Sequence, residues 1–143
     1  LERSMKTLSV RFFRQQKNAV ELANYLSKCD MIDKIYYPGL PSHKGHDIAK
    51  DQMNGFGAVI SFELNKKIDP ETFLKSLEMI NPSMSFAGVE STMLSPAETS
   101  HYLLTPEDRL AQGITDNLIR FSVGIEDVPD IVYDFEQALN KCK

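Results

Sequence analysis

The sequence predicts an α/β (α+β) sandwich, in which helices cover a small mixed or largely antiparallel sheet on at least one face. Segments with helical periodicity alternate with short segments whose apolar residues recur at every second position. Along the chain the order is helix, strand, helix, strand, helix, strand, short helix, strand and helix, without an internal repeat. The length of 143 residues suits a single domain with one hydrophobic core.

Residues 1–28 are predicted to form one long amphipathic helix. The segment contains neither Gly nor Pro, and its apolar residues recur at three-to-four spacing: Met5, Leu8, Phe12, Val20, Ala23 and Leu26. Such a helix would be about 42 Å long, which exceeds the diameter of a domain of this size. We therefore expect its first half to link to another domain or subunit. The chain opens at Leu1 without a capping residue, so we expect it to derive from a longer protein.

A strand and a short helix are expected next. Residues 35–37 are β-prone and are followed by the turn-forming pair Pro38-Gly39. Ser42 is placed to cap a short helix. Two glycines then precede residues 58–64, whose two-residue alternation makes them the clearest strand of the chain.

A helix and an irregular strand are predicted in the centre of the chain. Asp69 is a good N-cap and Pro70 suits the first helical position, so a helix should run through about Ile80. Residues 83–93 are predicted to form an irregular strand that Ala87-Gly88 interrupts.

The remaining elements are a short helix, a strand and a final helix. Thr105-Pro106 repeats the cap-then-proline pattern and predicts a short helix that Gly113 ends. Residues 118–127 contain a strand, and Asp127 begins a last helix with its apolar residues on one face: Ile131, Phe135, Ala138 and Leu139.

Arg120 is the most informative residue, because it places a permanent cation within an otherwise apolar strand. Alternation puts Ile119, Phe121, Val123 and Ile125 on the core face, and Leu118, Arg120, Ser122 and Gly124 on the other. Away from water an unpaired charge costs several kcal/mol, and a planar guanidinium pairs best with a carboxylate. The pattern alone leaves two partners equally open: an internal salt bridge, with Glu90 as the candidate, or a ligand anion.

The composition argues against several functional classes. The chain has 20 acidic and 16 basic residues, no basic cluster and no Trp, which is atypical of a nucleic-acid binder. No apolar run is long enough to cross a membrane and no signal peptide opens the sequence, so we expect a cytoplasmic protein. Cys29 and Cys142 match no metal-ligand spacing and are expected to be free thiols.

Other candidate sites have simpler explanations. His43 and His46 could share a metal, yet no third ligand has matching spacing, so we favour surface or capping roles. None of the four serines considered as nucleophiles lies in a Gly-x-Ser-x-Gly elbow: Ser85, Ser91, Ser95 and Ser100. The carboxylate pairs Glu107-Asp108 and Glu126-Asp127 lie at expected helix starts, where the helix dipole accounts for them.

Several ordered motifs give the chain a family resemblance. They are Arg3–Leu8, Tyr37–His43 with His46, Gly55–Ala58, Ser85–Ser91, Pro96-Ala97 with His101, and Gly113–Asn117 leading into Leu118–Asp127. Together they resemble the carboxy-terminal domain of the Cys/Met-metabolism family of pyridoxal-phosphate (PLP) enzymes. This family includes cystathionine β-lyase, cystathionine γ-lyase, cystathionine γ-synthase and methionine γ-lyase.

The resemblance implies roles for five residues in substrate binding. Arg120 would grip the α-carboxylate of an amino-acid substrate, and Ser85 would lie beside it. Phe86 and Met84 would line the distal end of the substrate, and Ser100, where relatives usually carry Thr, would lie close to the active site. No catalytic, cofactor-binding or metal-binding residue is expected in this chain.

Two departures from the family pattern concern the same region. Ala87 replaces the first of two glycines that usually follow the family's serine. Ser95 stands where many members have His. We therefore do not expect the substrate preference of any one member to transfer directly.

The resemblance also implies that residues 1–143 are a single substrate-gripping domain, with residues 1–28 as a linking helix. In relatives the Schiff-base lysine and the other PLP contacts lie in a larger preceding domain, so this chain alone is expected neither to bind PLP nor to turn over substrate.

The parent protein would be a trans-sulfuration enzyme. A cystathionine lyase is the first expectation, and a γ-synthase or methionine γ-lyase is the alternative. Expected partners are a sulfur amino acid, the upstream domain and further copies in a tetramer. A free-standing, non-catalytic binding or assembly module is the alternative of another class.

Overall fold

The computed structural model describes residues 2–142, and its centre is a five-stranded sheet. The strands are β1 (Ile32–Tyr36), β2 (Val59–Leu64), β3 (Asn81–Pro82), β4 (Thr92–Leu94) and β5 (Leu118–Ser122). Their order is β1-β2-β5-β4-β3. The β3–β4 pair is parallel, and the other three pairs are antiparallel. The predicted fold class, a mixed and largely antiparallel sheet with helices, is confirmed.

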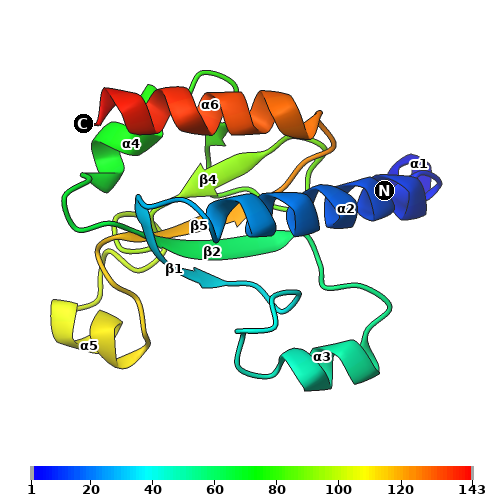
Figure 1. The fold of residues 1–143 in the computed structure, drawn as a ribbon, viewed down its shortest axis with the longest axis horizontal. Helices are drawn as coiled ribbons and strands as arrows, with labels where there is room; N and C mark the ends of the chain where they lie inside the picture. The colour runs from blue at the N-terminus through cyan, green and yellow to red at the C-terminus, as the bar shows by residue number, and fades with distance from the viewer. Residues whose placement is uncertain (1, 143) are drawn as a thin grey trace.

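Helices cover one face of this sheet. The helices are α1 (Glu2–Met5), α2 (Leu8–Leu26), α3 (His46–Gln52), α4 (Pro70–Ser76), α5 (Pro106–Ala111) and α6 (Val128–Lys141). Figure 1 shows α2, α4 and α6 over one side of the sheet, with α3 and α5 standing apart from it. Helix α6 packs against both α2 and α4. None of the helices in residues 2–142 has the length and apolar character to cross a membrane.

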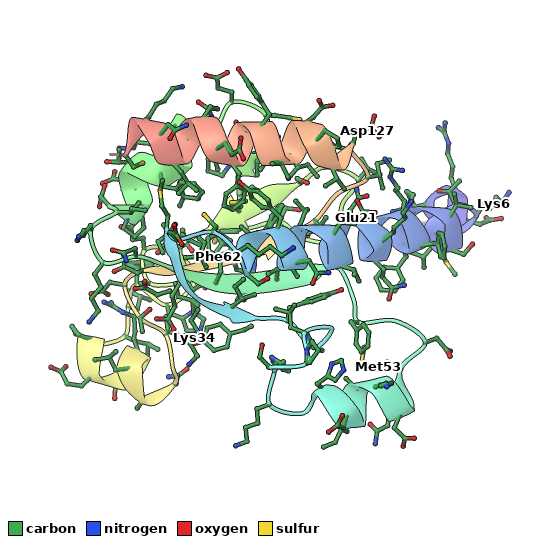
Figure 2. All side chains as sticks on the ribbon, in the orientation of Figure 1. Lys6, Glu21, Lys34, Met53, Phe62 and Asp127 are labelled. Atoms are coloured by element: carbon green, nitrogen blue, oxygen red, sulfur yellow. The ribbon has the colours of Figure 1, made fainter. Side chains whose placement is uncertain are left out.

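Aromatic rings fill the layer between the sheet and the helices. The ring of Phe135 on α6 lies 5.5 Å from Phe62, 5.3 Å from Phe73 and 6.0 Å from Phe121, measured between centroids. All four side chains are fully buried, and Figure 2 labels Phe62 of β2. Burying each ring stabilises the fold by about 1.5–3 kcal/mol.

The core face predicted for residues 119–125 is largely confirmed. Ile119, Phe121 and Val123 are fully buried. Ile125 is 38% exposed, so its assignment to the core was wrong. Strand β5 ends at Ser122, and the two-residue alternation therefore no longer governs Ile125.

The single helix predicted for residues 1–28 is wrong, because Lys6-Thr7 separates α1 from α2. The Ser4 carbonyl oxygen accepts the Arg11 guanidinium at 2.8 Å and lies 3.5 Å from the Thr7 hydroxyl. In a continuous helix the Ser4 carbonyl oxygen would accept a backbone N–H from the next turn, and here these two side chains bond to it instead. Lys6 lies at the outer end of the helical segment in Figure 2. The expectation drawn from Leu1 falls outside the described residues.

The apolar stripe predicted for this helix is core only in its second half. Ala23 and Leu26 are buried, whereas four members of the stripe are exposed: Met5, Leu8, Phe12 and Val20. The side of α2 that meets the sheet is partly polar, since Gln15 and Asn18 are buried there. Their amide groups bond to the chain after β5, which the apolar periodicity did not reveal.

Two helix boundaries also differ from prediction. Ser42 does not cap a helix, because α3 begins at His46 after Gly45, whose φ of 96° suits glycine. Helix α4 begins at the predicted Asp69 cap but ends at Ser76 rather than about Ile80. The reason is Asp134 of α6, whose carboxylate accepts the backbone N–H groups of residues 78, 79 and 80.

The remaining strand and helix predictions are met with small shifts. The strand expected at 35–37 is Ile32–Tyr36, the one at 58–64 is Val59–Leu64, and the helix after Thr105 is Pro106–Ala111.

The prediction of a single irregular strand at 83–93 is wrong. Two short strands, β3 and β4, are separated by residues 83–91, which we call the 83–91 loop.

Candidate functional site

Arg120 lies at the centre of β5, on the sheet face that α2 and α6 do not cover. It pairs in register with Ser61 of β2 and Leu94 of β4. Its neighbours Ile119 and Phe121 point into the core, so the Arg120 side chain leaves the sheet on the opposite face. The residue is half-buried, and this burial lowers the pKa of the guanidinium from its ordinary value. A cation deprived of water in this way favours a nearby anion.

The partners of Arg120 in the fold are neutral. Its Nη2 donates to the Met84 carbonyl oxygen at 2.8 Å, and its Cζ lies 5.0 Å from the centre of the Phe86 ring. Within residues 2–142 no carboxylate forms an ion pair with it, and Glu90, the suggested internal partner, is exposed. A guanidinium has five N–H donors, so most of the fork is left for a ligand.

The 83–91 loop supplies the groups around Arg120 and is held by the neighbouring strands. Thr92 donates its hydroxyl to the Ser85 carbonyl oxygen at 2.7 Å, and the Ala87 N–H donates to Ser122 Oγ at 2.9 Å. Ala87 has a φ of 61°, in the left-handed region that L-residues other than Gly avoid at a cost of about 1–2 kcal/mol. The hydrogen bond from its N–H helps to hold this conformation.

The structure brings together four of the five predicted site residues at this loop: Arg120, Met84, Ser85 and Phe86. Met84 and Phe86 are in contact with Arg120, yet their side chains are 63% and 60% exposed. Ser85 lies between them, is exposed, and makes no side-chain hydrogen bond within the described part of the chain. The Ser100 hydroxyl lies 2.8 Å from His101 Nδ1 and makes no hydrogen bond to the other four residues in the described part of the chain.

The histidines and cysteines form no comparable site. His46 Nδ1 lies 2.7 Å from the Pro38 carbonyl oxygen, and its ring stacks on Phe56 at 5.5 Å. Cys29 and Cys142 are free and half-buried. In the described ranges no three His, Cys, Asp or Glu side chains converge as metal ligands. His46 thus fixes the turn before α3.

The lysines do not suit the covalent attachment of an aldehyde cofactor. A Schiff-base lysine is activated by burial or by a neighbouring cation, which lowers its pKa. Every lysine between residues 2 and 142 is exposed. The groups around Arg120 fit the carboxylate of a small ligand, and the described lysines do not fit the aldehyde of PLP.

Comparison with known proteins decides the family. The family model described as Cys/Met metabolism PLP-dependent enzyme matches residues 1–140. The chain belongs to this family. The resemblance drawn from the sequence motifs is therefore confirmed.

Individual members of the Cys/Met family are similar to the chain over nearly its whole length. The L-methionine gamma-lyase of Fusobacterium nucleatum subsp. polymorphum is 45% identical over 97% of the chain, and the cystathionine gamma-lyase of Dictyostelium discoideum is 43% identical over 98%. A crystal structure of cystathionine gamma-lyase from Lactobacillus plantarum complexed with L-serine covers 98% of the chain at 41% identity, with a TM-score of 0.94. The chain spans 35%, 36% and 37% of these three proteins, respectively.

Sequence reasoning missed the polar residues that hold the 83–91 loop. Ser91 was considered only as a nucleophile and Glu126 only as a helix-start carboxylate, yet they bond to each other. Gln15 was not noticed, although its amide reaches Gly88 of the loop. The placement of Ser122 on the same strand face as Arg120 was the one usable signal, because it put a hydroxyl next to the expected site.

Proposed function

We propose that this chain is the carboxy-terminal, substrate-gripping domain of a larger PLP-dependent carbon-sulfur lyase that acts on cystathionine or a related sulfur amino acid. The observation that carries the proposal is Arg120, half-buried and without a carboxylate partner in the described chain. Family membership and the roughly one-third share of the relatives' length support it. The proposal places the enzyme in the cytoplasm as a tetramer, with residues 1–28 leading from the upstream PLP domain.

In this proposal Arg120 orients the substrate through its α-carboxylate. Two N–H groups of a guanidinium hold a carboxylate in one plane, which fixes the position of the attached Cα. The Met84 carbonyl oxygen and the Phe86 ring restrict the orientation of the guanidinium before the ligand arrives. The exposed side chains of Met84 and Phe86 would then contact the apolar, sulfur-bearing end of the substrate, with the Ser85 hydroxyl and Ser100 nearby.

The upstream domain is proposed to hold PLP, which when bound supplies the electron sink for negative charge at Cα. The residues of this chain bind and orient the substrate and keep water from part of the site. We therefore expect the isolated chain to be inactive. A stable absorbance band near the visible edge after incubation with PLP and dialysis, together with lyase activity, would contradict this part of the proposal.

The identities to family members do not distinguish which of the family's reactions the parent enzyme carries out. The methionine gamma-lyase and the cystathionine gamma-lyase match the chain at 45% and 43% identity, which does not separate them. We place a cystathionine lyase first, and a γ-synthase or methionine γ-lyase domain second.

A free-standing binding or assembly module is the alternative from another class. It is favoured by the exposed apolar side chains of α1 and α2, which offer a surface for assembly: Met5, Leu8, Val10, Phe12 and Phe13. The intact mass of the protein as first expressed separates the two proposals. A mass near 16.2 kDa favours the module, and a mass about three times larger favours the enzyme.

The carboxylate proposal is tested by titrating the ¹⁵N-labelled chain with L-methionine and following the backbone amide signals of the 83–91 loop, whose Met84 and Phe86 contact Arg120. We expect a saturable shift that Arg120→Ala abolishes and Arg120→Lys weakens, because lysine keeps the charge but lacks the fork. Arg109→Lys is the matched control, since Arg109 pairs with Asp116 outside this site. Equal titration curves for wild type and Arg120→Ala would refute the role of Arg120.

A further inference from the structure

The 83–91 loop is joined at intervals to the segment that begins at Arg120. Three residues at every second position of that segment bond to the loop, and the Ile125 N–H also donates to the Val89 carbonyl oxygen at 2.9 Å. The pairs are Arg120 with Met84, Ser122 with Ala87, and Gly124 with Ser91. The conformation of the loop around Arg120 is thus set by contacts along the whole segment.

The last of these contacts is reinforced by the carboxylate of Glu126. Its Oε1 accepts the Ser91 N–H at 2.6 Å, and its Oε2 accepts the Ser91 hydroxyl at 2.9 Å. Ser91 Oγ in turn accepts the Gly124 N–H at 3.0 Å. Ser91 is 1% exposed, so these hydrogen bonds lie away from water, where bonds to a charged acceptor are strongest.

The backbone at Gly124 approaches the loop too closely for any side chain. A Cβ on Gly124 would lie 2.5 Å from Ser91 N and 2.6 Å from the carbonyl carbon of Glu90. Real Cβ atoms do not approach other atoms so closely, so this position requires glycine. The glycine allows the Glu126 carboxylate to reach Ser91.

Helix α2 fixes both sides of this arrangement. Asn18 Nδ2 donates to the carbonyl oxygens of Gly124 and Glu126, at 3.1 and 2.7 Å. Gln15 Nε2 donates to the carbonyl oxygen of Gly88 in the loop at 2.7 Å. Glu126 is therefore held by the helix while its carboxylate holds the end of the loop.

We propose that Glu126, acting through Ser91, is a positioning residue for the Arg120 site. Removing the carboxylate leaves the Ser91 N–H and hydroxyl without their acceptor. The end of the 83–91 loop is then held less firmly, through the bond from the Ile125 N–H to the Val89 carbonyl oxygen. The loop then no longer presents the Met84 carbonyl oxygen to Arg120 in one conformation. The effect on a ligand rests on the proposed carboxylate function of Arg120, whereas the effect on the loop does not.

The test compares variants of the full 143-residue chain by NMR. Glu126→Ala and Ser91→Ala remove the contact from its two sides, and Glu126→Gln keeps the chain length and one acceptor oxygen. Glu90→Ala is the matched control, because Glu90 is an exposed carboxylate beside Ser91 with no hydrogen bond to it. Phe73→Leu controls for general destabilisation, because Phe73 is buried on α4. The readouts are the amide signals of the loop, the Arg120 Nε–H signal, and the Kd for L-methionine.

We expect Glu126→Ala and Ser91→Ala to shift or broaden the loop amides and the Arg120 signal, and to raise the Kd about fivefold or more. The double variant should resemble either single variant, because both break one contact. Glu126→Gln should recover most of the affinity, and Glu90→Ala and Phe73→Leu should match the wild-type Kd.

Two results would overturn the inference: loop amides in Glu126→Ala that coincide with those of the wild type, or an equal rise in Kd in Phe73→Leu. The absence of a saturable shift on titration of the wild-type chain with L-methionine refutes the proposed function instead. In that case the amide signals still decide whether Glu126 positions the loop.

Discussion

The guanidinium of Arg120 lies over the ring of Phe86, with 5.0 Å between Cζ and the ring centre, although the two residues are 34 positions apart in the chain. The ring itself is largely exposed, so it covers the cation without being part of the core. Phe86 therefore shields one face of the guanidinium while the edge that carries the N–H groups is left for an anion.

Replacing Phe86 should weaken carboxylate binding more than it weakens the fold. A cation–π contact at an exposed site contributes about 0.5–1 kcal/mol, so Phe86→Ala should raise the Kd for L-methionine by about two- to fivefold. Phe86→Tyr keeps the ring and should stay near wild type. Titration followed by the Arg120 signal measures both, and an unchanged Kd in Phe86→Ala would show that the ring does not assist binding.

Asp134 should stabilise the fold in a pH-dependent way. Burial by itself raises the pKa of its carboxyl, but the N–H groups of Glu78, Ile80 and Met79 and the Gln137 amide outweigh burial and lower the pKa below its ordinary value. A lowered pKa means that the stabilisation is present above the unfolded pKa of about 3.9 and is lost as pH falls through the folded value.

Asp134→Asn should lower the free energy of unfolding at pH 7 by about 2 kcal/mol, because one charged acceptor of several N–H groups is lost. Urea unfolding across pH measures this, and the gap between variant and wild type should narrow below about pH 4. Asp130→Asn is the matched control, since Asp130 is exposed on the same helix. A gap that stays constant into acid would show that the Asp134 charge is not what stabilises this region.

Elements with a strong local signal were predicted well. The alternation of residues 58–64 and the caps at Asp69 and Thr105 report directly on the backbone, and the structure contains β2, α4 and α5 there. The placement of Arg120 off the core face followed from the same alternation. In these places the local preference and the tertiary structure agree.

Predictions failed where side chains distant in sequence bond to the backbone. The end of α4 depends on Asp134, and the 83–91 loop depends on Ser122 and Glu126. No local pattern contains these partners. For the candidate site, periodicity predicted the face on which Arg120 lies, and the family resemblance supplied the residues expected beside it. Neither predicted the contacts that hold the 83–91 loop.

Removing the Ser95 hydroxyl should stabilise the protein. Ser95 is fully buried, and its Oγ has no hydrogen-bond partner in the described structure. Since a buried hydroxyl without a partner is unfavourable, Ser95→Ala should raise the free energy of unfolding by about 1 kcal/mol. Ser122→Ala is the contrasting control, because Ser122 Oγ accepts the Ala87 N–H and its loss should destabilise. Urea midpoints for both variants at equal m-values decide the point; a lower midpoint for Ser95→Ala would mean that its hydroxyl has a favourable partner.

Ala87→Gly should relieve backbone strain in the 83–91 loop. Ala87 has a φ of 61°, which costs about 1–2 kcal/mol for an L-residue, whereas glycine adopts it freely. Glycine also makes the unfolded chain more flexible, at about 0.5–1 kcal/mol, so the net gain in the free energy of unfolding should be about 0.5–1 kcal/mol. The same change at Ala58, a buried position where φ is not positive, should destabilise and serves as the control. The Ser122 hydroxyl helps to hold the strained conformation of Ala87. Ser122→Ala should therefore lower the free energy of unfolding by less when Ala87→Gly is also present. Urea unfolding of the two single variants and the double variant measures this coupling, and strictly additive changes would show that Ser122 does not support the conformation of Ala87.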